Sequence, residues 1–104
     1  MERRGFTMKL KPGNEAEYKR RHDEIWPELS RELAARGVRD YTIFLDRETL
    51  TLFAFQRVTE PNEVDGLPET GIMRKWWDYM ADLMEVNPDN SPVVKPLEEV
   101  FHAD

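Results

Sequence analysis

Alternation of apolar and polar residues predicts three β-strands in this chain. Residues 6–10 alternate and are followed by a Pro-Gly turn signal. Two more alternating runs, residues 41–45 and 50–56, flank the short polar stretch 46–49, which is typical of a hairpin. Both faces of these strands carry apolar side chains. One face should pack on helices, and the other must be covered by a ligand, by extra structure or by a second subunit.

Apolar residues at helical spacing predict a helix after the first strand. Asn14, followed three residues later by Glu17, resembles a capping box, so the helix should begin there. Its apolar stripe runs through Tyr18, His22, Ile25 or Trp26, Leu29 and Leu33. Because Pro27 lacks a backbone donor and restricts the residue before it, we expect two helical pieces that meet at Trp26-Pro27. Gly37 is suited to the C-terminal end of the second piece.

Apolar residues at helical spacing also predict a helix over residues 72–84. The stretch before it, 59–71, contains Pro and Gly and is typical of a loop or a broken first turn. Turn residues fill positions 87–92, and apolar residues between 97 and 101 suggest a short last strand. The resulting order, β-α-β-β-α-β, is that of the ferredoxin-like arrangement, an α+β fold with an antiparallel sheet and two helices on one face. We expect residues 1–104 to form this single domain.

Composition excludes several classes of function without selecting one. Charged residues make up 35% of the 104 residues and the net charge is −6, which disfavours nucleic acid and anionic membranes as partners. No cysteine is present, so disulfides and thiolate chemistry are excluded. We find no apolar signal-peptide segment and no run near the roughly 18 apolar residues of a membrane span. These features predict a soluble, cytoplasmic protein.

His22 is the first candidate for chemistry. A histidine titrates near pH 6.5, so its ring can donate and accept protons at cellular pH. Tyr18 lies one helical turn earlier on the same face, where the two side chains can meet. This pair would suit proton transfer to a small molecule. From the spacing alone, a half-buried histidine that packs against the sheet is the better interpretation.

Three aromatic residues are further candidates. Trp76 and Trp77 are adjacent and differ in direction by about 100°, so one can fill the core while the other lines a site. Tryptophan faces stack on the C–H face of a sugar ring, although two such residues can also simply fill a small core. Tyr41 begins the second strand of the pattern and can face either the helices or the opposite side of the sheet.

Metal and nucleotide sites are not predicted. The chain has two histidines and no cysteine, and it lacks HxH and HExxH spacings. Neither GxGxxG nor GxxxxGK[ST] occurs. We therefore expect neither a metal site nor a nucleotide site.

Four stretches, in this order and in a chain of this length, resemble the L-rhamnose mutarotase family. They are YKRRHDEIWPEL at 18–29, YTIFLD at 41–46, KWWDYM at 75–80 and NPDNSP at 87–92. The resemblance covers essentially the whole chain. It implies an isomerase that interconverts the α- and β-anomers of L-rhamnose without a metal or an organic cofactor. It also implies a homodimer, a dimeric α/β barrel in which two sheets pack face to face.

The resemblance also assigns roles to the candidates. His22 corresponds to the proton donor, and Tyr18, Tyr41, Trp76 and Trp77 correspond to the substrate-binding residues. A pyranose opens when its ring oxygen gains a proton and its anomeric hydroxyl loses one, so acid–base groups suffice. The opposite proton falls to Tyr18, Tyr41 or a water. Two alternatives remain. One is a cofactor-free monooxygenase of the same barrel class, since unrelated activities share that fold, and the other is a non-catalytic sugar- or small-molecule-binding module.

Overall fold

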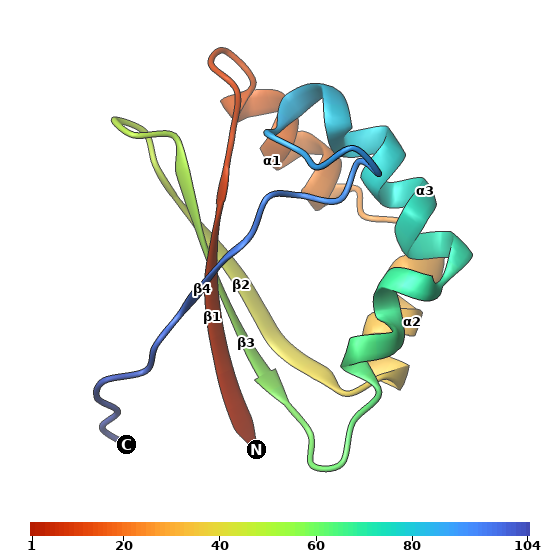
Figure 1. Ribbon diagram of the computed structural model, residues 1–104, viewed down its shortest axis with the longest axis vertical. Coiled ribbons are helices and arrows are strands. Elements are labelled where there is room, and N and C mark those ends of the chain that lie inside the picture. Colours follow the sequence, from red (N-terminus) through yellow and green to blue (C-terminus); the bar gives the residue numbers. More distant parts are fainter.

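The alternating runs form a four-stranded antiparallel sheet in the computed structural model, which describes residues 1–104 (Figure 1). Its strands are β1 (Glu2–Lys9), β2 (Val38–Asp46), β3 (Thr51–Val58) and β4 (Lys95–Leu97), in the spatial order β2-β3-β1-β4. β2 and β3 pair as the expected hairpin, and β1 pairs with both β3 and β4. The predicted α+β class with an antiparallel sheet is confirmed.

The helices all lie on one face of this sheet (Figure 1). They are α1 (Glu15–Asp23), α2 (Pro27–Ala35) and α3 (Gly71–Met80), with short 3₁₀ helices at Val64–Glu69 and Ala81–Leu83. The stretch 59–71 thus contains a single 3₁₀ segment and no continuous α-helix, as expected. None of the helices combines the length and the apolar character that crossing a membrane requires.

The break between α1 and α2 lies where the sequence predicts it. Trp26 has extended backbone dihedrals, φ −62° and ψ 128°, because the ring of Pro27 disfavours the helical conformation at the preceding residue. Pro27 then occupies the first turn of α2, where a missing backbone donor costs nothing. After α2, Gly37 has φ +108°, which is the left-handed conformation expected of a residue that ends a helix.

The predicted capping box at Asn14 is wrong. Asn14 precedes α1, but its dihedrals, φ −106° and ψ 9°, are not extended, and its side chain makes no capping hydrogen bond. The acidic residues Glu15 and Glu17 remain favourable in the first turn, since they face the positive end of the helix dipole. A side-chain cap occurs instead on α3, where the Thr70 hydroxyl accepts a bond from the Met73 amide at 3.3 Å.

A bulge in β2 decides which way Tyr41 points. Arg39 pairs with Arg57 and Thr42 pairs with Phe55, so β2 has one more residue than β3 in this interval. Asp40 has a left-handed φ of +48° and its carboxylate pairs with Arg57 at 3.1 Å. In a regular strand Tyr41 would share a face with Arg39. The extra residue reverses that alternation and turns Tyr41 toward the helices.

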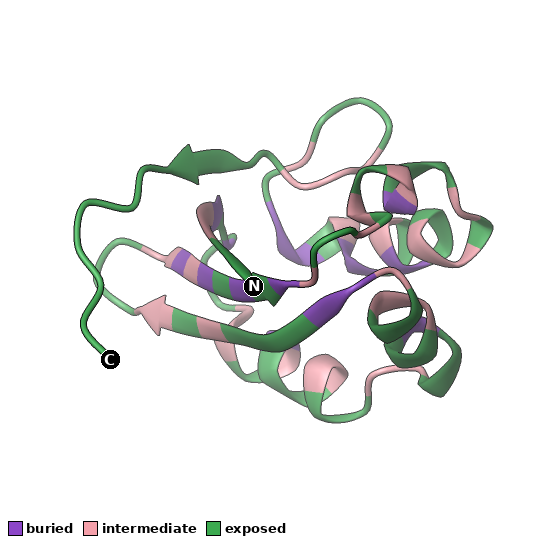
Figure 2. Ribbon diagram, turned by 90° about the horizontal axis from the view of Figure 1, so that it is seen from below, coloured by how far each residue is buried: buried purple, intermediate pink, exposed green.

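The core forms between the helices and one face of the sheet. Along β3, Leu52, Ala54 and Val58 are at most 1% exposed and Gln56 is 9% exposed, so every second residue of the strand is buried (Figure 2). On that outer face Phe44 and Phe55 are 59% and 47% exposed, with ring centroids 6.2 Å apart. The second apolar face predicted from the sequence is therefore present and uncovered in the single chain.

The last strand lies earlier in the chain than expected, since β4 covers Lys95–Leu97 and shares only Leu97 with the predicted residues 97–101. Pairing with β1 ends at Leu97, and Val100 and Phe101 are 87% and 81% exposed. Arg3 and Glu99 form an ion pair at 2.6 Å, so the tail stays beside β1 without a backbone ladder.

Gly37→Ala should destabilise the protein more than Gly13→Ala. Both glycines have left-handed φ values, which cost an alanine roughly 1–2 kcal/mol. At Gly37 a Cβ would also collide with the Thr59 hydroxyl and lie 2.9 Å from the Cβ of Asn62, whereas nothing lies within 4 Å at Gly13. We expect a further ~1–3 kcal/mol at Gly37, measured by urea unfolding. Equal decreases in the free energy of unfolding of the two variants would show that packing does not constrain Gly37 at the end of α2.

Candidate active site

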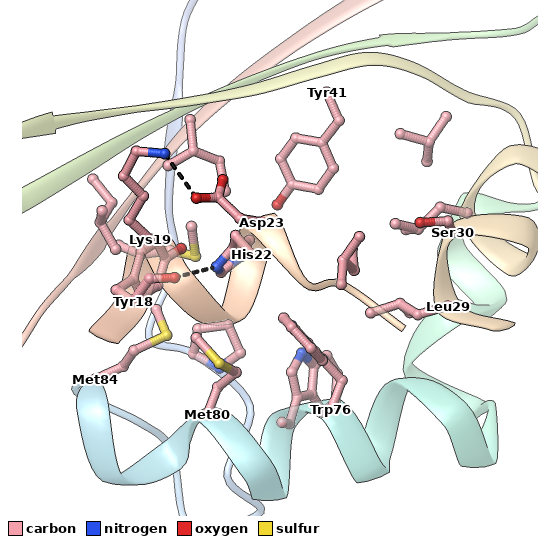
Figure 3. A pocket seen from close by; sticks show the side chains of 18 of the residues that line it. Tyr18, Lys19, His22, Asp23, Leu29, Ser30, Tyr41, Trp76, Met80 and Met84 are labelled. Carbon is pink, nitrogen blue, oxygen red and sulfur yellow. Dashed lines mark hydrogen bonds and ion pairs between the residues drawn. The ribbon is translucent and has the colours of Figure 1, made fainter. Parts of the chain in front are cut away.

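The helices and the inner face of the sheet enclose a cavity of about 820 Å³. This volume is within the range of roughly 300–1,000 Å³ found for small-molecule sites. All five residues singled out from the sequence line it: Tyr18, His22, Tyr41, Trp76 and Trp77. They come from α1, β2 and α3, and Figure 3 shows Tyr18, His22, Tyr41 and Trp76 gathered around the same space.

One wall of the cavity is a helical stripe on α1. Glu15, Tyr18, Lys19 and His22 follow the spacing i, i+3, i+4 and i+7, so their side chains share one face of the helix. The rings of Tyr18 and His22 have centroids 4.3 Å apart and are inclined by 32°. The contact inferred from their spacing in the sequence is therefore present.

The tautomer of His22 follows from its partner. Its Nδ1 lies 3.0 Å from the backbone carbonyl oxygen of Tyr18. A carbonyl oxygen only accepts hydrogen bonds, so Nδ1 carries the proton and donates. In the neutral ring Nε2 then has the lone pair and is the nitrogen available for proton exchange.

Burial makes His22 a weaker base than a free histidine. Removal of the ring from water lowers the pKa of His22 below its ordinary value of 6.5. The hydrogen bond to the Tyr18 carbonyl and the charge of Asp23 oppose this effect only in part. His22 is therefore mainly neutral at pH 7, in the form that accepts a proton.

The two cavity tyrosines keep their protons. Burial, with a smaller contribution from nearby Tyr41, raises the pKa of Tyr18 far above its ordinary range. Burial also raises the pKa of Tyr41 to about 12, with Gln56 acting in the opposite direction. Tyr41 is 39% exposed as a residue, but its hydroxyl points into the cavity (Figure 3). Both phenols are thus hydrogen-bond donors at neutral pH.

The tandem tryptophans divide between core and cavity. Trp76 is 8% exposed, belongs to the hydrophobic core and also meets the His22 ring edge-on at 5.4 Å. Trp77 is only partly buried and packs against the edge of the same core. Both line the cavity, so the adjacent pair gives it two differently oriented aromatic surfaces.

Sequence reasoning missed several polar residues of the cavity. Lys19 and Asp23 line it and form an ion pair at 2.8 Å (Figure 3). Glu15 lines it too, and its Oε1 is enclosed without a hydrogen-bonding partner. The i, i+4 and i+7 spacing from Glu15 to His22 was the available signal. No group of three or more His, Cys, Asp or Glu side chains is arranged to hold a metal ion.

Comparison with known proteins gives consistent matches over the whole chain. A family model described as L-rhamnose mutarotase matches residues 3–103. The L-rhamnose mutarotase of Bacteroides thetaiotaomicron is 59% identical over 104 residues, which is 100% of both chains. The L-rhamnose mutarotase of Formosa agariphila is 56% identical over 102 residues, 98% of each chain.

Two solved structures have similar folds. The crystal structure of an L-rhamnose mutarotase from Formosa agariphila superposes with a TM-score of 0.93 at 54% identity and covers 100% of both chains. The structure of Rv0793 from Mycobacterium tuberculosis gives a TM-score of 0.61 at 14% identity, covering 98% of this chain and 97% of that one. The second likeness concerns the fold alone.

NMR titration should show that His22 is protonated at Nδ1 in its neutral form and titrates below pH 6.5. Burial disfavours the imidazolium, and the Tyr18 carbonyl holds the proton on Nδ1. The chain has only two histidines, so a His102→Asn variant assigns both imidazole signals. A neutral ring protonated at Nε2, or a midpoint at or above 6.5, would contradict this description.

Proposed function

Because this chain belongs to the L-rhamnose mutarotase family and interconverts the anomers of L-rhamnose, we propose that His22 is its acid–base catalyst. The observation that carries the proposal is the position of the His22 ring. It lines the cavity, and its Nδ1 is engaged by a backbone carbonyl, which leaves one nitrogen for the sugar. The same cavity holds the aromatic surfaces that a small deoxy sugar requires.

The proposed reaction uses one nitrogen twice. Neutral His22 accepts the proton of the anomeric hydroxyl at Nε2. The bond between C1 and the ring oxygen then breaks, with its electron pair leaving on the ring oxygen, and C1 becomes an aldehyde carbon. The imidazolium donates its proton to the ring oxygen. Rotation about C1–C2 and the reverse steps close the ring on the opposite face.

Tyr18 and Tyr41 are proposed to bind the sugar as neutral phenols. Because their pKa values are raised, both phenols stay protonated at neutral pH and cannot accept a further proton readily. A tyrosine is therefore not the favoured acceptor of the anomeric hydroxyl proton. In the proposed mechanism His22 itself accepts that proton. The phenols donate hydrogen bonds to oxygens on which negative charge develops, an interaction that strengthens away from bulk water.

Trp76 and Trp77 are proposed to enclose the apolar part of the substrate. A rhamnose ring presents C–H groups on its faces and a methyl group at C6. Indole faces stack favourably on such groups. The different orientations of the two side chains support contacts to both the ring face and the methyl end.

We also propose a ferredoxin-like subunit that forms a homodimer, a dimeric α/β barrel. The strand order β2-β3-β1-β4 supports the first part. The exposed outer face of the sheet, with Phe44, Phe55 and Leu97, supports face-to-face packing with a second copy. The cytoplasmic location expected from the composition stays a prediction.

The two alternatives considered from the sequence are not supported by a specific observation. A cofactor-free monooxygenase rested on fold likeness, and the likeness of the whole sequence is to mutarotases. A non-catalytic sugar-binding module would bind L-rhamnose without accelerating its anomer exchange. Exchange measured by NMR with and without the protein separates that case directly.

His22→Asn should lower kcat/KM for anomer exchange by about 10²–10⁴-fold, because its amide cannot shuttle a proton. The wild-type kcat/KM should fall on the acid side with a midpoint below 6.5, since only the neutral ring accepts the anomeric proton. Saturation-transfer NMR on L-rhamnose measures both, with protein-free samples subtracted at each pH. A fully active His22→Asn variant would refute the assignment.

Phe55→Glu should convert the proposed dimer to a monomer. A charge in the apolar outer face is expensive to bury against a second sheet. Sedimentation should change from about twice 12.3 kDa to 12.3 kDa. Ala35→Glu, also an exposed apolar residue but on α2, is the control and should leave the mass unchanged. A 12.3 kDa wild-type protein would rule out the dimer.

A further inference from the structure

Three side chains behind the cavity wall have no role in the mechanism described above. Arg21, Trp26 and Tyr79 do not line the cavity. The side chain of Arg21 is 11% exposed, whereas that of the adjacent Arg20 is 54% exposed. Arginine is rarely enclosed to this degree unless every donor finds a partner.

Arg21 fastens α1 to the C-terminal end of α3. Its Nε donates to Glu17 at 2.7 Å, and its Nη1 donates to the Tyr79 carbonyl at 2.6 Å. Nη1 and Nη2 together engage Asp82 at 2.9 and 3.3 Å, and this lowers the pKa of the Asp82 carboxyl. The last carbonyls of a helix lack partners within it and attract cations. A guanidinium supplies both the donors and the charge.

A continuous series of aromatic contacts runs from Arg21 to the cavity. The guanidinium carbon lies 4.4 Å from the centroid of the Tyr79 ring. Tyr79 stacks on Trp26 at 5.4 Å and 29°. Trp26 meets Trp76 edge-on at 5.1 Å and 86°, and Trp76 meets His22 edge-on at 5.4 Å and 88°. Each ring in this series therefore limits the orientation of the next.

We propose that Arg21 is a positioning residue for the reaction. By holding Tyr79 against Trp26, it fixes the ring of Trp76 and, through that ring, the placement of His22 in the cavity. The inference rests on the role proposed for His22. This positioning role requires the planar guanidinium of arginine. A lysine would place one charge there but could not bridge two oxygens of Asp82 in the same plane.

Arg36 offers a matched control for a purely structural ion bridge. Its side chain is 24% exposed, and it donates to the Glu32 carboxylate at 2.7 Å and to the Glu63 carbonyl at 3.1 Å. It thus ties two segments together with the same kinds of bond as Arg21. It does not line the cavity and lies in no aromatic contact of the series.

The test compares Arg21→Met with Arg36→Met at a temperature where both are fully folded by circular dichroism. Arg21→Met should raise the pKa of His22 toward 6.5, because a loosely held ring gains contact with water. It should also lower kcat about tenfold with a smaller change in KM, as expected when a catalytic group is displaced. In Arg21→Lys, the His22 pKa and kcat should lie between those of the wild type and of Arg21→Met. Arg36→Met should change neither quantity.

Identical His22 titrations and kcat values in the two methionine variants would overturn the proposal. If Arg21→Met does not fold, Asp82→Asn replaces it, since this change removes the carboxylate partner and leaves the cation over Tyr79. A wild-type titration in Asp82→Asn also counts against the proposal. An active His22→Asn variant would instead refute the proposed function, while the His22 titration would still report how Arg21 places the ring.

Discussion

The site depends on the conformational restriction that Pro27 imposes on Trp26. In an uninterrupted helix Trp26 would follow His22 at i+4 and project from the same face, into the space that the cavity occupies. The extended backbone at Trp26 instead ends α1 at Asp23 and starts a new helix at Pro27. Trp26 then packs against both Trp76 and Tyr79, behind the cavity that it would otherwise have filled.

Local signals in the sequence were sufficient for most of the fold. Alternation predicted β1 and the hairpin, and the helix break followed from the chemistry of proline alone. The wrong predictions concern residues whose conformation depends on contacts that a local pattern does not show. Asn14 has the right residue type for a cap but the wrong backbone conformation, and the apolar residues after Leu97 meet no buried face.

The candidate site was partly predictable for the same reason. Tyr18 and His22 are one turn apart on one helix, so spacing was enough to bring them together. The direction of Tyr41 was not predictable from alternation, because Phe44 makes the opposite face of this run apolar too. In the structure Tyr41 shares the inner face with Ile43 and Leu45, and the additional residue at Asp40 reverses only the residues before it. Arg21 was hidden among charged neighbours, since its deciding partners, Tyr79 and Asp82, lie about 60 positions away in the chain.

The bond between Nδ1 of His22 and the Tyr18 carbonyl also bears on how a turnover begins and ends. It leaves one nitrogen for exchange, so on the proposed mechanism a proton taken from the sugar returns to the sugar from that same atom. The protein then regains its starting state without drawing on a buffer or releasing an ion. As with any catalyst, the equilibrium between the anomers is unchanged, and net flux runs toward whichever anomer is below its equilibrium proportion.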